Sequence, residues 1–173
     1  MPPDIERPRP GAGRFDFFFY GTLCDADVRQ VVLGRAVEAT PAILDSYEAV
    51  PVEHGRYPIL QFLRGKSATG VLCRGLDLTE AARLGYYEHE GRDYGVKRLP
   101  VRLNSDAGPR TQPAWVFVQR ATLRRGMGRW DLAEWQRFAK RDFLDGVTRA
   151  MRKLEPKDLE PFIELWRGRA SNT

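Results

Sequence analysis

The residues best suited to chemistry lie where an aromatic run gives way to a glycine. Phe17 to Phe19 are followed directly by Tyr20-Gly21-Thr22-Leu23. Aromatic residues suit a packed strand, and glycine can adopt backbone angles that other residues avoid. The pattern predicts a strand, a tight turn and a short helix from Cys24 to Leu33, closed by Gly34. The unpaired N–H groups at a helix start favour a carboxylate or an oxyanion, although an ordinary first strand and turn fits the same spacing.

A carboxylate is the second candidate. Glu88 and Glu90 stand in a segment rich in apolar and aromatic groups, namely Leu84, Tyr86, Tyr87 and Tyr94. A carboxylate among aromatic rings loses hydration, so its pKa rises and it can take and return a proton near neutral pH. Two surface glutamates at the end of a helix would give the same pattern.

Other catalytic chemistries find less support in the sequence. Cys24 lies at the start of the expected helix, where a thiolate would be favoured. Only His89 could serve as its base, and Asp25 and Asp27 would oppose the negative charge. His54 and His89 are the only histidines, and no zinc-type spacing occurs. We therefore expect no metal, and no glycine-rich phosphate loop or other motif indicates a cofactor.

Length and composition indicate an ordinary globular protein. The chain has 173 residues, of which 42% are hydrophobic and 29% charged, and these values suit one domain with a sizeable core. No apolar run approaches the roughly 20 residues that cross a bilayer. Residues 1–14 contain four prolines and are expected to form a disordered tail rather than a signal peptide. Two cysteines without a disulfide framework favour a reducing compartment, and we expect the cytoplasm.

The basic residues concentrate after residue 119, and the formal net charge is +5. A basic face can bind nucleic acid. Here the arginines alternate with acidic residues such as Asp131, Glu134 and Asp142, which is typical of a solvated helix surface. Nucleic-acid binding is therefore the less favoured interpretation.

The remaining chain predicts a small mixed or antiparallel sheet, closed into a barrel, with flanking helices. Asp77-Leu78-Thr79-Glu80 has the form of a capping box that opens a helix, which we expect Gly85 to interrupt. Beyond Asp131 the apolar residues follow a helical period; Gly146 is a candidate break and Pro156 a stop. The expected strands are Ala36–Asp45, Tyr47–Val52, Ile59–Leu63, Ala68–Leu76, Tyr94–Leu103 and Ala114–Val118, with turns or loops at His54–Pro58, Gly65-Lys66 and Asn104–Pro113. The residues that keep close to this helical period are Leu132, Trp135, Phe138, Leu144, Val147, Met151 and Leu154. In a short helix around Leu159 to Trp166, we expect Phe162, Ile163 and Trp166 to face inward.

Two motifs together carry a family resemblance. Phe19-Tyr20-Gly21-Thr22-Leu23 is followed about 60 residues later by Leu84-Gly85-Tyr86-Tyr87-Glu88, and then by Tyr94. This order and separation, over residues 15–118, resembles the gamma-glutamylcyclotransferase-like family, of the gamma-glutamylamine cyclotransferase type. That family shows Tyr-Gly-Thr-Leu at the end of its first strand and Leu-Asp-x-(Phe/Tyr)-Glu around its catalytic glutamate. The chain departs from the pattern at Gly85, where aspartate is usual, and at Phe117, where tyrosine is common.

The resemblance implies an α+β fold over residues 15–173, with a helical C-terminal extension at about 131–167. It implies that Tyr20, Gly21, Thr22 and Leu23 line the substrate loop and that Glu88 is the general acid/base. The implied reaction cyclises a gamma-glutamyl amide to 5-oxoproline and releases an amine or amino acid, without a cofactor. An inactive gamma-glutamyl-binding or regulatory domain of the same fold is the alternative, favoured by Gly85 and Phe117. The leaving group and the oligomeric state stay open.

Overall fold

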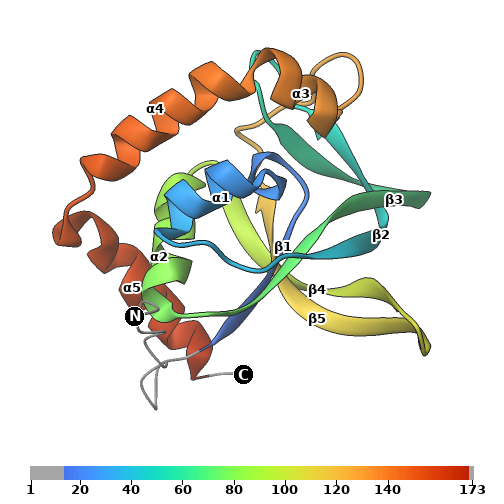
Figure 1. The fold of residues 1–173 in the computed structure, drawn as a ribbon, viewed down its shortest axis with the longest axis horizontal. Helices are drawn as coiled ribbons and strands as arrows, with labels where there is room; N and C mark the ends of the chain where they lie inside the picture. The colour runs from blue at the N-terminus through green and yellow to red at the C-terminus, as the bar shows by residue number, and fades with distance from the viewer. Residues whose placement is uncertain (1–13, 172–173) are drawn as a thin grey trace, which may run out of the picture.

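The computed structural model describes residues 14–171, which form a closed five-stranded barrel with helices gathered on one side (Figure 1). The predicted N-terminal tail lies outside the described residues except for Arg14, which is exposed. The strands are β1 (Phe15–Phe19), β2 (Thr40–Pro51), β3 (Pro58–Leu76), β4 (Tyr94–Ser105) and β5 (Gly108–Gln119). The helices are the 3₁₀ turn η1 (Thr22–Cys24), α1 (Ala26–Leu33), α2 (Leu78–Tyr87), α3 (Leu132–Phe138), α4 (Lys140–Arg152) and α5 (Pro156–Ala170).

The barrel has a mixed sheet in the strand order β1-β3-β2-β4-β5. β1 pairs antiparallel with β3 and parallel with β5, and the other neighbouring strands are antiparallel. The predicted fold class, an α+β barrel-like sheet with flanking helices and a helical C-terminal extension, is confirmed. In the described part of the chain, no helix is both long enough and apolar enough to cross a membrane.

The aromatic strand β1 is buried on both faces, which explains its unbroken apolar run. Phe18 and Tyr20 join the core inside the barrel, with Leu44, Leu72 and Val116. Phe15, Phe17 and Phe19 point the other way, into the core that the helices cover. β1 therefore lies between two cores, and the turn that follows it lies where both cores end.

Two predicted interruptions of the sheet are wrong. The expected turn at Gly65-Lys66 is instead an irregularity within one long strand, β3, where the pairing jumps from Asp45–Ser67 to Tyr47–Phe62. The expected polar loop Asn104–Pro113 is mostly strand, because β4 and β5 pair as far as Ser105 and Gly108. Both segments extend into solvent, where polar residues and turn formers are tolerated in an exposed hairpin.

Helices α2 and α3 begin where the sequence predicts, after Asp77 and Asp131, but the predicted interruptions are wrong. Asp77 and Glu80 form the predicted capping box, but α2 continues through Gly85 to Tyr87. Similarly, the C-terminal helices divide at Ala139 and not at Gly146, which lies inside α4.

The C-terminal helices also differ from the sequence analysis at two residues. Pro156 starts α5, since its fixed φ suits the first helical turn. Phe138, which keeps the helical period of the apolar residues, is 71% exposed and is the last residue of α3 before the break at Ala139.

Candidate functional site

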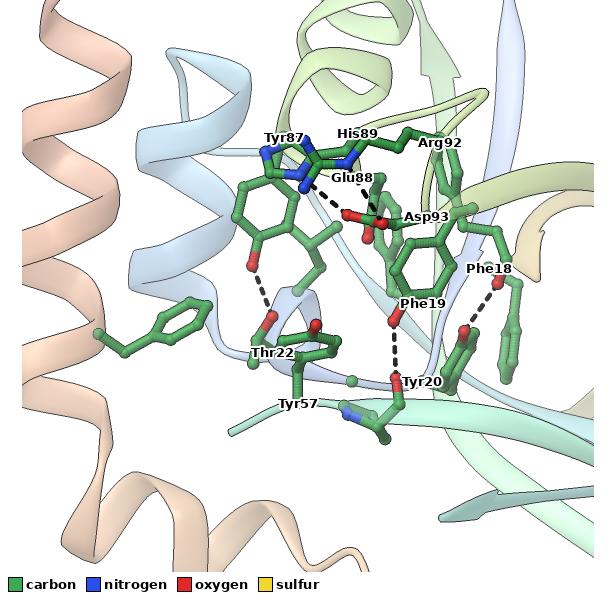
Figure 2. A pocket seen from close by; sticks show the side chains of 16 residues that line it. Phe18, Phe19, Tyr20, Thr22, Tyr57, Tyr87, Glu88, His89, Arg92 and Asp93 are labelled. Atoms are coloured by element: carbon green, nitrogen blue, oxygen red, sulfur yellow. Dashed lines mark hydrogen bonds and ion pairs between the residues drawn. The ribbon is translucent and has the colours of Figure 1, made fainter. Parts of the chain in front are cut away.

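A cavity of about 310 Å³ opens where β1 ends (Figure 2). Its walls come from the turn after β1, the start of β3, the loop between α2 and β4, the strand β5, and α4. Every site residue predicted from the sequence (Tyr20, Gly21, Thr22, Leu23 and Glu88) lines this cavity. Segments more than 60 residues apart in the chain thus meet in one place.

The turn after β1 is shaped by close packing. The Tyr20 hydroxyl donates a 2.7 Å hydrogen bond to the Phe117 carbonyl inside the protein. A Cβ at Gly21 would lie 2.8 Å from the Pro58 ring, so glycine is needed here for close approach. Its φ of −121° lies outside the left-handed region that favours glycine. The first backbone bond of η1 joins the Cys24 N–H to the Gly21 carbonyl, so the Thr22 and Leu23 N–H groups precede it and have no partner within the turn.

Glu88 lies at the C-terminal cap of α2, on the other side of the cavity from Thr22 (Figure 2). Burial raises the pKa of its carboxyl from 4.5 to about 8, because desolvation disfavours the charged form. Within residues 14–171 no hydrogen bond or ion pair ties down this carboxylate. Glu88 is therefore a half-buried carboxyl that lines the cavity and has no side-chain partner within the described residues.

Tyrosines surround this carboxyl. Tyr87 and Thr22 share a 2.6 Å hydrogen bond between their hydroxyls, and the Tyr94 hydroxyl donates to the Pro58 carbonyl at 3.0 Å. Burial raises the pKa of the Tyr20, Tyr87 and Tyr94 hydroxyls, and the nearby negative charge of Glu88 raises it further. These hydroxyls stay protonated, so they can donate hydrogen bonds but cannot act as bases.

The mouth of the cavity is charged on one side and apolar on the other. Asp93 contacts His89 Nδ1 at 3.1 Å and Arg92 Nε at 3.5 Å, and all three residues line the opening. Phe143 of α4 lies at the edge of the cavity. Sequence reasoning missed these four residues as parts of the site. Phe143 has one usable signal, because it lies four residues before Val147 on the helical period. The sequence marks His89 only as a possible base for Cys24, and it does not mark Arg92 or Asp93.

The two departures from the family pattern have different surroundings. A Cβ at Gly85 would lie 2.8 Å from the Phe162 ring of α5 and 2.9 Å from Glu90 Oε2, so helix packing requires glycine there. Phe117 lines the cavity and stacks on Phe17, with ring centroids 5.8 Å apart. The first departure makes room for α5, and the second gives the cavity an apolar wall.

Cys24 is unsuited to nucleophilic catalysis. Burial raises the pKa of its thiol to about 12, and the Sγ atom donates a hydrogen bond to the Phe19 carbonyl at 3.1 Å. A buried, protonated thiol is a poor nucleophile. Cys24 also lies outside the wall of the cavity that holds Glu88. Among residues 14–171, no three histidine, cysteine, aspartate or glutamate side chains cluster in a way that could hold a metal ion.

Solved structures define the class of fold. A solution structure of an Arabidopsis thaliana protein superimposes with a TM-score of 0.58 and 20% identity, covering 82% of this chain and 93% of that chain. A structure titled gamma-glutamyl cyclotransferase gives a TM-score of 0.54 at 12% identity, covering 87% of this chain and 98% of that one. The barrel with its helical cover is therefore a gamma-glutamyl cyclotransferase-like fold.

Sequence comparison defines the family. The family model for gamma-glutamyl cyclotransferase, AIG2-like, matches residues 17–137, and the chain belongs to this family. AIG2-like protein C of Arabidopsis thaliana is 29% identical over 150 residues, covering 86% of this chain and 83% of its own length. The matched stretch contains the turn at Tyr20–Leu23 and Glu88, and it ends before α4 and α5.

Proposed function

We propose that the protein is a cyclotransferase that cleaves a gamma-glutamyl amide into 5-oxoproline and a free amine or amino acid. One observation carries the proposal. A carboxyl with a pKa raised to about 8 faces a cavity whose opposite wall is an amide-bearing turn. That pairing supplies a proton carrier and an anion cradle in the same space, and the reaction requires these two parts.

The substrate brings its own nucleophile. Its alpha-amino nitrogen attacks the gamma-carbonyl carbon and closes a five-membered ring. Holding the chain in a folded conformation can contribute roughly 7 to 11 kcal/mol toward such an intramolecular barrier. The aromatic walls of the cavity, which include Tyr57 and Tyr94, suit this task.

Glu88 moves the proton. As the ring C–N bond forms, the ionised carboxyl takes a proton from the attacking nitrogen. It then gives this proton to the leaving nitrogen as the original amide C–N bond breaks and the carbonyl re-forms. General acid–base catalysis of this kind typically contributes 10²–10⁴-fold. At pH 7 a carboxyl of pKa about 8 is roughly one-tenth ionised, and a bound ammonium group beside it would raise that fraction.

The turn at Gly21-Thr22-Leu23 stabilises negative charge. The Thr22 and Leu23 N–H groups precede the first bond of η1 and border the cavity. They would donate to the alpha-carboxylate of the substrate or to the oxyanion of the tetrahedral intermediate. Because Thr22 Oγ1 also hydrogen-bonds to the Tyr87 hydroxyl, the turn is connected to the helix that presents Glu88.

The cysteines bear on the compartment of the proposed reaction. The free thiols Cys24 and Cys73 fit a reducing compartment, and we propose that the reaction takes place in the cytoplasm.

The test is 5-oxoproline release from a panel of gamma-glutamyl amino acids and gamma-glutamyl amines. The wild-type protein should release 5-oxoproline from at least one compound, and Glu88→Gln, which keeps the size but cannot carry the proton, should lose this turnover while remaining folded. Comparable turnover by Glu88→Gln would remove Glu88 from its role.

The inactive alternative predicts a different result. The apolar Phe117 wall, without the hydroxyl of a tyrosine, favours this alternative. If this alternative holds, the wild-type protein would bind gamma-glutamyl compounds in calorimetry, but neither the wild-type protein nor Glu88→Gln would form 5-oxoproline.

A further inference from the structure

The last turn of α2, which presents Glu88, closes in an unusual way. Its end is a Schellman motif, in which the Glu90 N–H bonds to the Gly85 carbonyl at 2.9 Å and the His89 N–H to the Tyr86 carbonyl at 3.3 Å. The residue between the cap Glu88 and Glu90 must adopt a left-handed conformation, and here it is His89, with φ of 49°. Glycine normally fills this position because it has no Cβ penalty. The turn thus carries local strain, which persists only where the surrounding structure holds it.

The Glu90 side chain connects this turn to α5. Its Oε2 accepts a 3.0 Å hydrogen bond from the Trp166 indole N–H, and its Oε1 forms an ion pair with the Arg169 guanidinium. The Glu90 side chain is only 2% exposed and that of Arg169 21%. Removing one partner of such a buried pair is costly, because it leaves the other charge uncompensated. Glu90 is therefore bound firmly to α5.

The anchor on α5 is itself rigid. Trp166 is fully buried and packs against Phe15, Phe17 and Trp115 at ring-centroid distances of 5.1, 5.1 and 5.3 Å. Arg169 lies over the Trp166 ring at 4.3 Å. The Glu90 carboxylate therefore reaches back across the α2 turn, beside Gly85, to a fixed point on the outer face of the barrel.

We infer that Glu90 is a positioning residue, which with Arg169 and Trp166 holds the last turn of α2 so that Glu88 faces the cavity. This inference deepens the proposed function and rests on it for the role of Glu88. It also gives α5 a part in the site although that helix lies beyond the residues that the family model matches. Because Gly85 has no side chain, it leaves the space that the Glu90 carboxylate and the Phe162 ring occupy, at a position where the family usually has aspartate.

Loosening the turn should expose Glu88 to water and lower its pKa, because burial is what raises it. Other titratable and charged groups near Glu88 can also change its pKa, so their effects must be distinguished from the effect of loosening the turn. Tyr20 and Tyr57, beside the ends of β1 and β3, face Glu88 together with Tyr87 of α2 and Tyr94 of β4. The charged rim adds His89, Arg92 and Asp93, and the α4 residue at the cavity, Phe143, is apolar. None of these groups changes in the variants below.

Two variants distinguish positioning from direct electrostatics. Glu90→Gln removes a negative charge and Arg169→Met a positive one, so direct charge effects on Glu88 would have opposite signs. Positioning predicts that both variants lower the pKa of Glu88 by at least about one unit. The matched control is Arg167→Met on the same helix, because Arg167 pairs with the exposed Glu164 and not with the α2 turn.

The measurement is carbon-13 NMR titration of glutamate side-chain carboxyls, with the Glu88 signal assigned by its loss in Glu88→Gln. This readout needs no substrate, so it tests the positioning role even if no gamma-glutamyl compound turns over. An unchanged or raised pKa of Glu88 in folded Arg169→Met would overturn the inference. If Arg169→Met does not fold, the double variant Glu90→Gln/Arg169→Met, which removes both charges, should show the lowered pKa. An unchanged value there would overturn the inference as well.

Kinetics supply the second readout. With a compound that the wild-type protein cyclises, kcat of Glu90→Gln should fall at least about tenfold while KM changes less, since small misplacements of a catalytic group are costly. If the double variant Glu90→Gln/Arg169→Met is as stable as the wild-type protein, its kcat should still be as low as that of Glu90→Gln. Full recovery of kcat together with stability would show a purely structural role and would overturn the inference.

Discussion

The raised pKa of Glu88 makes a prediction about stability that is independent of any substrate. A carboxyl of pKa about 8 in the folded protein and 4.5 when unfolded binds its proton more tightly in the folded state. Its protonated form therefore favours the fold. This contribution is fully present below pH 4.5 and is lost as the pH rises to about 8 and beyond.

The magnitude follows from the two pKa values. Each unit corresponds to about 1.4 kcal/mol, so ionising Glu88 costs about 5 kcal/mol of folding free energy at high pH. Of this loss in folding free energy, about 1 kcal/mol is already present at pH 5 and about 3 kcal/mol at pH 7. Glu88→Gln carries no charge at any pH and escapes the cost. Its stability advantage over the wild-type protein should therefore grow by about 4 kcal/mol between pH 5 and pH 9.

The assay is urea unfolding of both proteins at pH 5, 7 and 9, with the free energy taken from the linear dependence on urea. Glu80→Gln is unsuitable as a control because Glu80 is in the capping box and pairs with Arg35, so exposed Glu164→Gln serves instead. A difference between wild type and Glu88→Gln that stays constant across this range would refute a desolvated Glu88.

Three further predictions concern the remaining parts of the site. Thr22→Pro removes one backbone donor, at the first position of η1, where proline is tolerated. The control is Thr22→Val, which lacks only the hydroxyl. Calorimetry should show that Thr22→Pro binds 5-oxoproline at least about tenfold more weakly than Thr22→Val. Equal binding by the two variants would remove the Thr22 N–H from the cradle. Cys24→Ser should retain 5-oxoproline release within about twofold because the thiol is buried and protonated, and a loss of activity in the folded variant would restore a role for the thiol. Gly85→Asp should lower the thermal midpoint by several degrees, since its Cβ and charge would collide with Phe162 and Glu90, and an unchanged midpoint would contradict that packing.

The parts that the sequence predicts well are those with local causes. The aromatic run of β1 is buried on both sides, so its composition alone marks it as a strand. The Asp77–Glu80 capping box works within four residues and can be identified by eye. The family resemblance, and not the spacing, predicts that the first turn and Glu88 lie in the same site, and both line one cavity.

The parts that the sequence misses depend on partners far away in the chain. Gly85 looks like a helix breaker, yet its role is set by Phe162, a residue of another helix. Glu90 looks like a second surface glutamate until Arg169 and Trp166 are placed beside it. Gly65 and Lys66 predict a turn, but these residues suit an irregularity within a strand equally well, and only the pairing of β3 with β2 distinguishes the two.

The packing of Trp166 limits how far the C-terminus of this protein can be truncated. The family match ends at residue 137, and a fragment designed to that limit would lack the helix carrying Trp166. The rings of Phe15, Phe17 and Trp115 would then meet water on the outer wall of the barrel. Such a bare aromatic patch promotes association between copies, so the shortest soluble unit of this chain must extend through α5.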